Sequence, residues 1–350
     1  MNDRDIERVR EREFPLTERV TYLDFATFGP LPTSHVRAAS EALAAEAAKG
    51  SAGLDGTALL ESVREEAAAL LHSPARNVCL LTSTSEGMGL VAAGLPWRAG
   101  DEVIVPEQEF EGCVAPFLSL GDVTVRVART VAEIPDLVGE RTRAVALSLV
   151  DRIGGARAPV EAIAAACREH DTWLALDAAQ AMGVLDLDAP ALGADVVCAH
   201  GYKFLVSGFG LAPTYCSDRA LAELRVPRPG WKNAGVGHGS AARFEPTMSS
   251  IPVLAGMRES LRLLNSLDAV ERERRALDTA RGIAQGLAAR GFQVREQRSS
   301  LVSAPHPDAE TLATRLHERG IVAAAVEGNL RLSTHFFTTD SDVQALLDAL

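Results

Sequence analysis

Short apolar runs alternate with helix-like stretches along the middle of the chain. Six runs rich in Val, Leu and Ile are followed by a seventh, Gly210–Cys216; the six are Val78–Leu81, Glu102–Val105, Val123–Ala128, Ala144–Val150, Trp173–Asp177 and Val196–Ala199. Strands that are apolar on both faces are typical of parallel sheets covered by helices. Ala-rich stretches with helical spacing, such as Pro159–His170, predict those helices. The pattern therefore predicts a doubly wound α/β sheet. Gly210–Cys216 is expected to be antiparallel, because it follows its neighbour too closely for a helical crossover.

The pattern changes after Pro252. One long helix is expected over Val253–Arg290, with a break near Leu267–Asp268. The remaining segments predict four strands and two helices; the strands are Phe292–Arg295, Leu301–Ala304, Ile321–Val326 and Asn329–Ser333, and the helices are Asp308–Arg319 and Asp340–Leu350. We therefore expect an N-terminal arm or amphipathic helix over 1–20, a large domain over 21–250, and a small α+β domain over 251–350.

Composition narrows the functional classes. The 350-residue chain carries a formal net charge of −12, which argues against a nucleic-acid or anionic-membrane surface. No apolar run approaches the ~20 residues that a membrane span needs, and the charged N-terminus does not resemble a signal peptide. None of the five cysteines forms a CxxC pair. These features predict a cytoplasmic protein without a metal site that acts on a small molecule.

Three segments carry candidate chemistry where predicted strands end. Asp177 closes one strand and Gln180 follows it, while Lys203 comes after the next strand. Ligands of doubly wound sheets bind at the carboxyl ends of strands. Thr84 and Ser85 open a helix after the first strand, where hydroxyl and N–H groups can bind a phosphate. The alternatives are a structural cap for Asp177, a solvated surface charge for Lys203, and a plain helix N-cap for the hydroxyl residues.

Together with two terminal motifs, these segments resemble the class V aminotransferase family of fold-type I pyridoxal-phosphate (PLP) enzymes. The motifs are YLDFATFGP at Tyr22–Pro30 and LRLSTHFFTT at Leu330–Thr339. The family includes cysteine desulfurases and proteins similar to isopenicillin-N epimerase. The resemblance implies a large domain with a mostly parallel seven-stranded sheet, a smaller α+β C-terminal domain, and PLP as the cofactor.

The resemblance also implies roles for the residues that match the family's motifs. Lys203 would form a Schiff base with PLP and then remove the Cα proton of the substrate. Asp177 would pair with the pyridine nitrogen and keep it protonated, so that the ring accepts electron density. Gln180 would contact the phenolic oxygen. His200 and Tyr202 would join Thr84 and Ser85 around the phosphate.

Four further positions bear on the ring, the substrate and the assembly. Phe110 would stack on the ring, and Arg331 would bind the substrate carboxylate. Thr247 lies in a segment that is similar to one reaching the phosphate of a neighbouring subunit, which implies a homodimer with active sites at the interface. Asp151 and Arg152 occupy positions where other members place polar groups, often asparagine, and they bear on substrate choice.

The sequence leaves the reaction open. Desulfurases of this family use a cysteine upstream of the carboxylate-binding arginine, but no cysteine follows Cys216, and Phe110 stands where they have histidine. A desulfurase is therefore placed last among the catalytic alternatives. An aminotransferase and a carbon–sulfur β-lyase acting on a cysteine conjugate are held level, with an amino-acid epimerase behind them. The joint presence of Lys203, Asp177, Gln180 and Arg331 argues against a non-catalytic protein.

Overall fold

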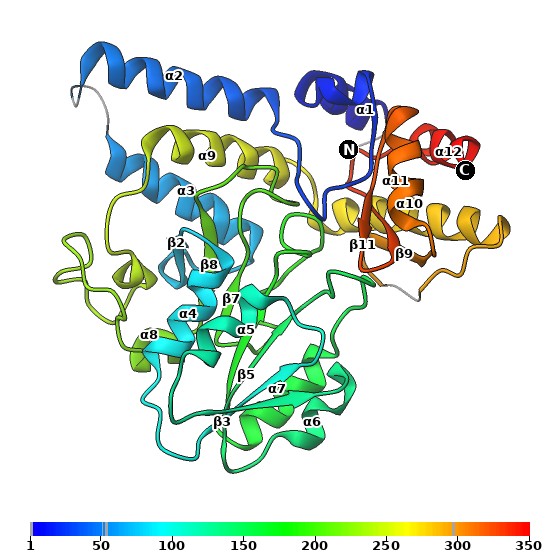
Figure 1. The fold of residues 1–350 in the computed structure, drawn as a ribbon. Coiled ribbons are helices and arrows are strands. Elements are labelled where there is room, and N and C mark those ends of the chain that lie inside the picture. The colour runs from blue at the N-terminus through cyan, green and yellow to red at the C-terminus, as the bar shows by residue number, and fades with distance from the viewer. Residues whose placement is uncertain (1–2, 51, 53–54, 296–297) are drawn as a thin grey trace.

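A seven-stranded sheet forms the centre of the computed structural model, which describes residues 3–50, 52, 55–295 and 298–350 (Figure 1). Its strand order is β2-β8-β7-β6-β5-β3-β4. The strands are β2 (Val78–Leu81), β3 (Glu102–Pro106), β4 (Thr124–Ala128), β5 (Thr142–Ser148), β6 (Trp173–Asp177), β7 (Val196–Cys198) and β8 (Ala212–Cys216). β8 is antiparallel to both of its neighbours, whereas the other pairs are parallel. The predicted fold class and the antiparallel strand are confirmed.

The sheet is buried on both faces, as its apolar strands require. Along β6, Leu174 and Leu176 belong to one apolar cluster, whereas Trp173 and Ala175 belong to another. Successive side chains of a strand point to opposite faces, so each strand contributes to both clusters. The helices that follow β2, β3, β4, β5 and β8 are, in this order, α4 (Thr84–Gly94), α5 (Glu111–Leu118), α6 (Ile134–Leu137), α7 (Val160–Glu169) and α8 (Asp218–Glu223).

Helices α2 (Thr33–Lys49) and α3 (Gly56–Leu70), which the sequence analysis did not predict, pack against α9 (Ile251–Asn265) (Figure 1). A Cβ added at Gly256 of α9 would lie 2.5 Å from the His35 ring of α2, so the close approach requires glycine. The predicted break in the long helix is confirmed. Helix α10 (Ala269–Ala289) begins after Asp268, whose carboxylate accepts a hydrogen bond from Glu271 N at 2.9 Å.

A smaller antiparallel sheet follows, with the order β11-β12-β9. Its strands and the neighbouring helices are β9 (Leu301–Pro305), β11 (Ala324–Val326), β12 (Asn329–Ser333), α11 (Ala309–Glu318) and α12 (Asp340–Ala349). The strand predicted over Phe292–Arg295 is wrong. Arg295 N donates to Ser303 O at 2.9 Å, but the described part of this segment does not continue into a ladder.

The strand predicted over Ile321–Val326 is present but is divided into two strands with different partners. Its first part, β10 (Ile321–Val322), pairs in parallel with β1 (Thr21–Tyr22). Its second part forms β11 and pairs with β12. The partner changes within six residues because the N-terminal strand β1 pairs with the first part. The local periodicity of the sequence does not reveal this pairing.

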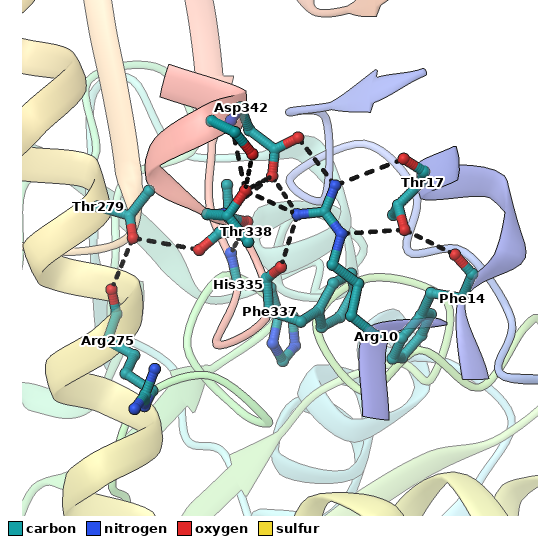
Figure 2. Close-up of polar contacts among 11 residues, drawn as sticks. Arg10, Phe14, Thr17, Arg275, Thr279, His335, Phe337, Thr338 and Asp342 are labelled. Carbon is teal, nitrogen blue, oxygen red and sulfur yellow. Dashed lines mark hydrogen bonds and ion pairs between the residues drawn. The ribbon is translucent and has the colours of Figure 1, made fainter. Parts of the chain in front are cut away.

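The N-terminal segment forms the expected helix, α1 (Asp3–Glu13), rather than a frayed arm; its residues 1–2 lie outside the described residues. Arg10 donates to Phe337 O at 3.1 Å and to Thr339 Oγ1 at 3.0 Å, and its guanidinium pairs with Asp342 (Figure 2). Phe14 stacks on Phe337 with 3.8 Å between ring centroids. These contacts join the two ends of the chain. The predicted domain boundaries remain predictions. None of the helices in the described part of the chain has the length and apolarity to span a membrane.

Candidate active site

Asp177 and Lys203 lie at the carboxyl ends of two adjacent parallel strands. Asp177 is the last residue of β6 and pairs in register with Cys198 of β7, after which the chain runs on to Lys203. Burial raises the pKa of Asp177 to about 6, while Ala179 N at 2.8 Å and the charge of Lys203 oppose the rise. Burial lowers the pKa of Lys203 to about 8, against the attraction of Asp177. Near pH 7 both groups are therefore mainly charged and attract each other.

The backbone around Lys203 is held by hydrogen bonds to three consecutive carbonyls. Tyr202 O accepts from Gly29 N at 2.7 Å, and Lys203 O accepts from Val206 N at 3.0 Å. Phe204 O lies 2.9 Å from His335 Nε2. A Cβ at Gly29 would lie 2.1 Å from Lys203 O, so only glycine fits there. The lysine is thereby fixed by segments from both ends of the chain.

Of these hydrogen-bond partners, His335 is the one that acts through its side chain. No role was predicted for it from the sequence. It is fully buried, and its Nδ1 accepts from Phe336 N at 2.9 Å, so Nε2 carries the hydrogen that reaches Phe204 O. Its ring also stacks on Phe337, which contacts Phe14 of the N-terminal segment (Figure 2). Burial lowers the pKa of His335 to about 3, so the ring is neutral at physiological pH.

We expect the His335→Phe variant to lose about 1–3 kcal/mol of unfolding free energy, because Phe204 O would remain buried without its donor. His335→Gln keeps an N–H donor and should lose less. Urea unfolding of the two variants and the parent protein measures the difference. Equal stability of the phenylalanine variant and the parent would show that the contact with Phe204 O contributes nothing.

The charge state of Lys203 gives a second test. The chain contains three lysines, Lys49, Lys203 and Lys232, so each can be followed separately. After ¹³C reductive methylation of the cofactor-free protein, the NMR signal of Lys203 should titrate near pH 8, because burial destabilises the ammonium form. Titration of the Lys203 signal at the value of a dimethyl-lysine free in solution would contradict the described environment.

The hydroxyl residues predicted to bind phosphate lie at the start of α4. Ser83 is the N-cap, since its Oγ accepts from Glu86 N at 3.1 Å, so the cap does not require Thr84 or Ser85. Thr84 is buried and its Oγ1 accepts from His200 N at 3.0 Å, whereas Ser85 is exposed. The structure thus brings Thr84 and His200 together.

Aromatic rings extend from this position across the loop that follows β7. The His200 and Tyr202 rings stack with 3.7 Å between centroids, and Tyr202 stacks on Phe209 at 4.2 Å. Burial lowers the pKa of His200 to about 3, so its ring is neutral. Phe110 lies at the start of α5, is 40% exposed, and has the guanidinium of Arg152 5.7 Å from its ring centroid.

Arg331 is buried in β12 beside two residues that the sequence analysis left without a role, Asp24 and Thr27. Its guanidinium donates to Thr27 Oγ1 at 2.6 Å and to Arg152 O at 2.9 Å, and it lies 3.5 Å from the Asp24 carboxylate. Asp24 comes soon after β1 and forms a β-bridge with Ser333, which places it at this position. Both residues stand in the quoted motif Tyr22–Pro30, and a buried arginine calls for a carboxylate partner.

Glu109 is a further buried carboxylate that the sequence analysis missed. Its two oxygens accept from Ser148 Oγ at 2.5 Å and from Ser148 N at 2.6 Å. Ser148 is in register with Asp177. Burial raises the pKa of Glu109, and its charge contributes to the raised pKa of Asp177. A second carboxylate therefore tunes the one at the strand end.

Thr247 is exposed and accepts a hydrogen bond from Trp231 Nε1 at 3.1 Å. Trp231 is itself 70% exposed. These contacts do not join Thr247 to the residues around Lys203. Its predicted role at a neighbouring subunit therefore remains a prediction, as does the homodimer.

The site fits a cofactor that carries a phosphate and a ring nitrogen. Two buried atoms beside Lys203 and Asp177, Gln180 Oε1 and His200 Nδ1, have no hydrogen-bond partner within the described residues. Gln180 Nε2 donates to Ala26 O at 3.1 Å, which fixes the amide. Buried polar atoms without partners are rare in proteins, so a bound polar group would complete this arrangement. The Lys203 amine, the Asp177 carboxylate, the start of α4 and the Arg331 guanidinium lie in one region of the structure.

Comparison with known proteins identifies what the chain is similar to. The family model described as Aminotransferase class-V matches residues 21–346. A probable cysteine desulfurase from Methanothermobacter thermautotrophicus is 31% identical over 227 residues, which are 61% of this chain and 57% of that protein. A probable cysteine desulfurase from Streptomyces coelicolor is 29% identical over 229 residues, 57% of this chain and 54% of that protein. The matched region thus spans little more than half the length of these two relatives.

Solved structures share the fold over nearly the whole chain. The complex of the cystine C-S lyase C-DES with its reaction product cysteine persulfide has a TM-score of 0.88 at 23% identity, and covers 96% of this chain and 98% of that one. This likeness supports the fold described above. The names of the two relatives point to cysteine desulfuration. From the sequence, this reaction was ranked after the other catalytic alternatives.

Proposed function

The chain belongs to the class-V aminotransferase family of PLP enzymes, and from this premise we propose that it cleaves the carbon–sulfur bond of a cysteine-derived amino acid by β-elimination. The relatives' names point to the sulfur of cysteine. We choose elimination because every cysteine in the sequence is buried.

A desulfurase must accept sulfur on a thiolate, which requires an accessible thiol of low pKa. Burial raises the pKa of Cys113 and Cys198 well above that of an ordinary thiol, and it raises the pKa of Cys167 to about 12. Contact with Cys216, together with burial, raises the pKa of Cys79 in the same direction. Buried thiols with raised pKa values are poor sulfur acceptors, so we infer that the sulfur leaves with the electron pair of the carbon–sulfur bond rather than passing to the protein.

The residues around Lys203 supply what this reaction needs. PLP, when bound, withdraws electron density from the substrate Cα. Lys203 Nζ would hold the cofactor and later take the Cα proton, since its lowered pKa places a useful fraction of neutral amine near pH 7. Asp177 would hold a proton on the ring nitrogen, and Arg331 would orient the substrate carboxylate. Thr84, Ser85, His200 and Tyr202 would surround the phosphate, Gln180 the phenolic oxygen, and Phe110 the ring face.

Transamination is the second candidate, because it uses the same base and the same carboxylate partner. Epimerisation is less well supported. It requires a proton on the opposite face of the substrate Cα, and Phe110, which we place on the ring, has no proton to give.

Product analysis distinguishes these reactions. The holoenzyme is incubated with S-alkyl cysteine conjugates without added keto acid, and ammonia, pyruvate and thiol are measured. We expect the three products in equal amounts over many turnovers. In a parallel incubation with L-cysteine, alanine together with protein-bound sulfur would identify a desulfurase. Turnover that stops until a keto acid is added would identify an aminotransferase.

A further inference from the structure

We propose that Arg152 determines substrate specificity by binding an anionic group on the substrate side chain. The preferred substrates would then be amino acids, such as cysteine conjugates, that carry a second carboxylate beyond the α-carboxylate. This inference rests on the proposed function and names its substrate class.

A rigid loop presents Arg152 to the site. Val150 and Arg157 bridge the base of the loop, and Asp151 N donates to Ala156 O at 2.9 Å. The Asp151 carboxylate accepts from Ile153 N at 3.1 Å and also from the next backbone N–H, so it serves the loop itself. Of the two unusual residues at this position, Arg152 is therefore the one available to a ligand.

The Arg152 side chain lies among the residues assigned to cofactor and substrate. Its carbonyl accepts from Arg331 Nη1 at 2.9 Å, which places the loop against the expected α-carboxylate site. Its guanidinium lies over the Phe110 ring. Its charge adds to the effect of burial in lowering the pKa of both Lys203 and Arg331, which indicates electrostatic reach to both.

The two arginines differ in how deeply their ion pairs are buried. The Arg331–Asp24 pair is mostly buried, with 6% and 15% of the side chains exposed. Arg152 pairs at 2.5 Å with Glu327, which is 51% exposed and lies in the turn between β11 and β12. The Arg152 side chain is 25% exposed, so solvent reaches both partners of this pair and weakens it, and a substrate carboxylate can compete with Glu327. Arg152 Nε is buried and has no hydrogen-bond acceptor within the described residues, so the guanidinium can still donate.

The alternative is that Arg152 only ties its loop to the β11–β12 turn. In that case Arg152→Gln and Glu327→Gln break the same contact and should change the protein in the same direction. If Arg152 binds substrate, the two changes have opposite effects, because Glu327 competes with the substrate for the guanidinium.

The first test compares two substrates of the same shape and different charge, S-carboxymethyl-L-cysteine and S-carbamoylmethyl-L-cysteine. We expect the holoenzyme to prefer the carboxymethyl conjugate by roughly ten- to one-hundred-fold in kcat/KM, as for a charged hydrogen bond. The preference should fall towards one in Arg152→Gln and rise in Glu327→Gln. No preference in the parent protein, or the same shift in both variants, would overturn the proposal.

The second test does not depend on turnover. Calorimetry measures binding of succinate and of succinamate, its monoamide with one carboxylate in place of two, to the holoenzyme and to both variants. We expect the parent to bind succinate roughly tenfold more tightly or better, Arg152→Gln to lose this difference, and Glu327→Gln to increase it. If neither conjugate is cleaved but this pattern holds, the proposed reaction fails and Arg152 keeps its role. Equal binding of both compounds to the parent would overturn the inference even if elimination occurs.

Discussion

Lys203→Ala should lower turnover by at least ~10²–10⁴-fold, the range contributed by a positioned general base, and should abolish covalent attachment of the cofactor. Lys203 follows β7 at the strand-end position beside Asp177, and its backbone is fixed by Gly29, Val206 and His335. The methyl side chain of alanine cannot replace the Lys203 amine, which would hold the cofactor and move the Cα proton.

The other two lysines provide matched controls. Lys49 is exposed at the end of α2, and Lys232 pairs with Glu245 at 2.6 Å. We expect Lys49→Ala to keep parental turnover and cofactor content. Steady-state kinetics and absorbance spectra of the purified variants provide both readouts. A Lys203→Ala protein with parental kcat would remove the lysine from the mechanism.

Arg331→Ala should lower kcat/KM by about 2–5 kcal/mol, roughly 30- to 5000-fold, mainly through a higher KM. The variant replaces a buried guanidinium, which would bind the substrate carboxylate, by a methyl group, so that the carboxylate would lose its partner. Arg331→Lys keeps the charge but not the planar fork, so its loss should be intermediate.

The Arg331 experiment needs a control for folding, because Asp24 would be left buried without its partner. Breaking one side of a buried pair costs about 3–5 kcal/mol of stability. Combining Arg331→Ala with Asp24→Asn removes the stranded charge and should recover part of this stability without recovering kcat/KM. Parental kcat/KM in the folded double variant would exclude Arg331 from substrate binding.

Local sequence patterns predicted the large sheet and the residues at its edge. β6 and β7 are short apolar runs, and Asp177 ends one while Lys203 follows the other, so neighbouring parallel strands bring them together. The apolar positions of α3 recur at helical spacing and α2 is rich in alanine, and these signals could have been used.

Contacts between distant segments were beyond such patterns. Asp24 meets Arg331, and Arg10 meets Asp342, only because β1 lies beside β10 and the N-terminal helix reaches the C-terminal segment. His335 contacts Phe204, which lies in the distant loop after β7. A single sequence shows that these side chains are polar or charged, but it does not show which partner each one will find across the folded chain.

The central claim is that Lys203 holds the cofactor, and borohydride reduction tests it most directly. The purified protein is loaded with PLP, reduced and digested, and mass spectrometry locates the added cofactor among the peptides that carry the three lysines. We predict one cofactor per chain on the peptide that contains Lys203. Cofactor on Lys49 or Lys232 instead, or on none of the three, would contradict the proposed active site.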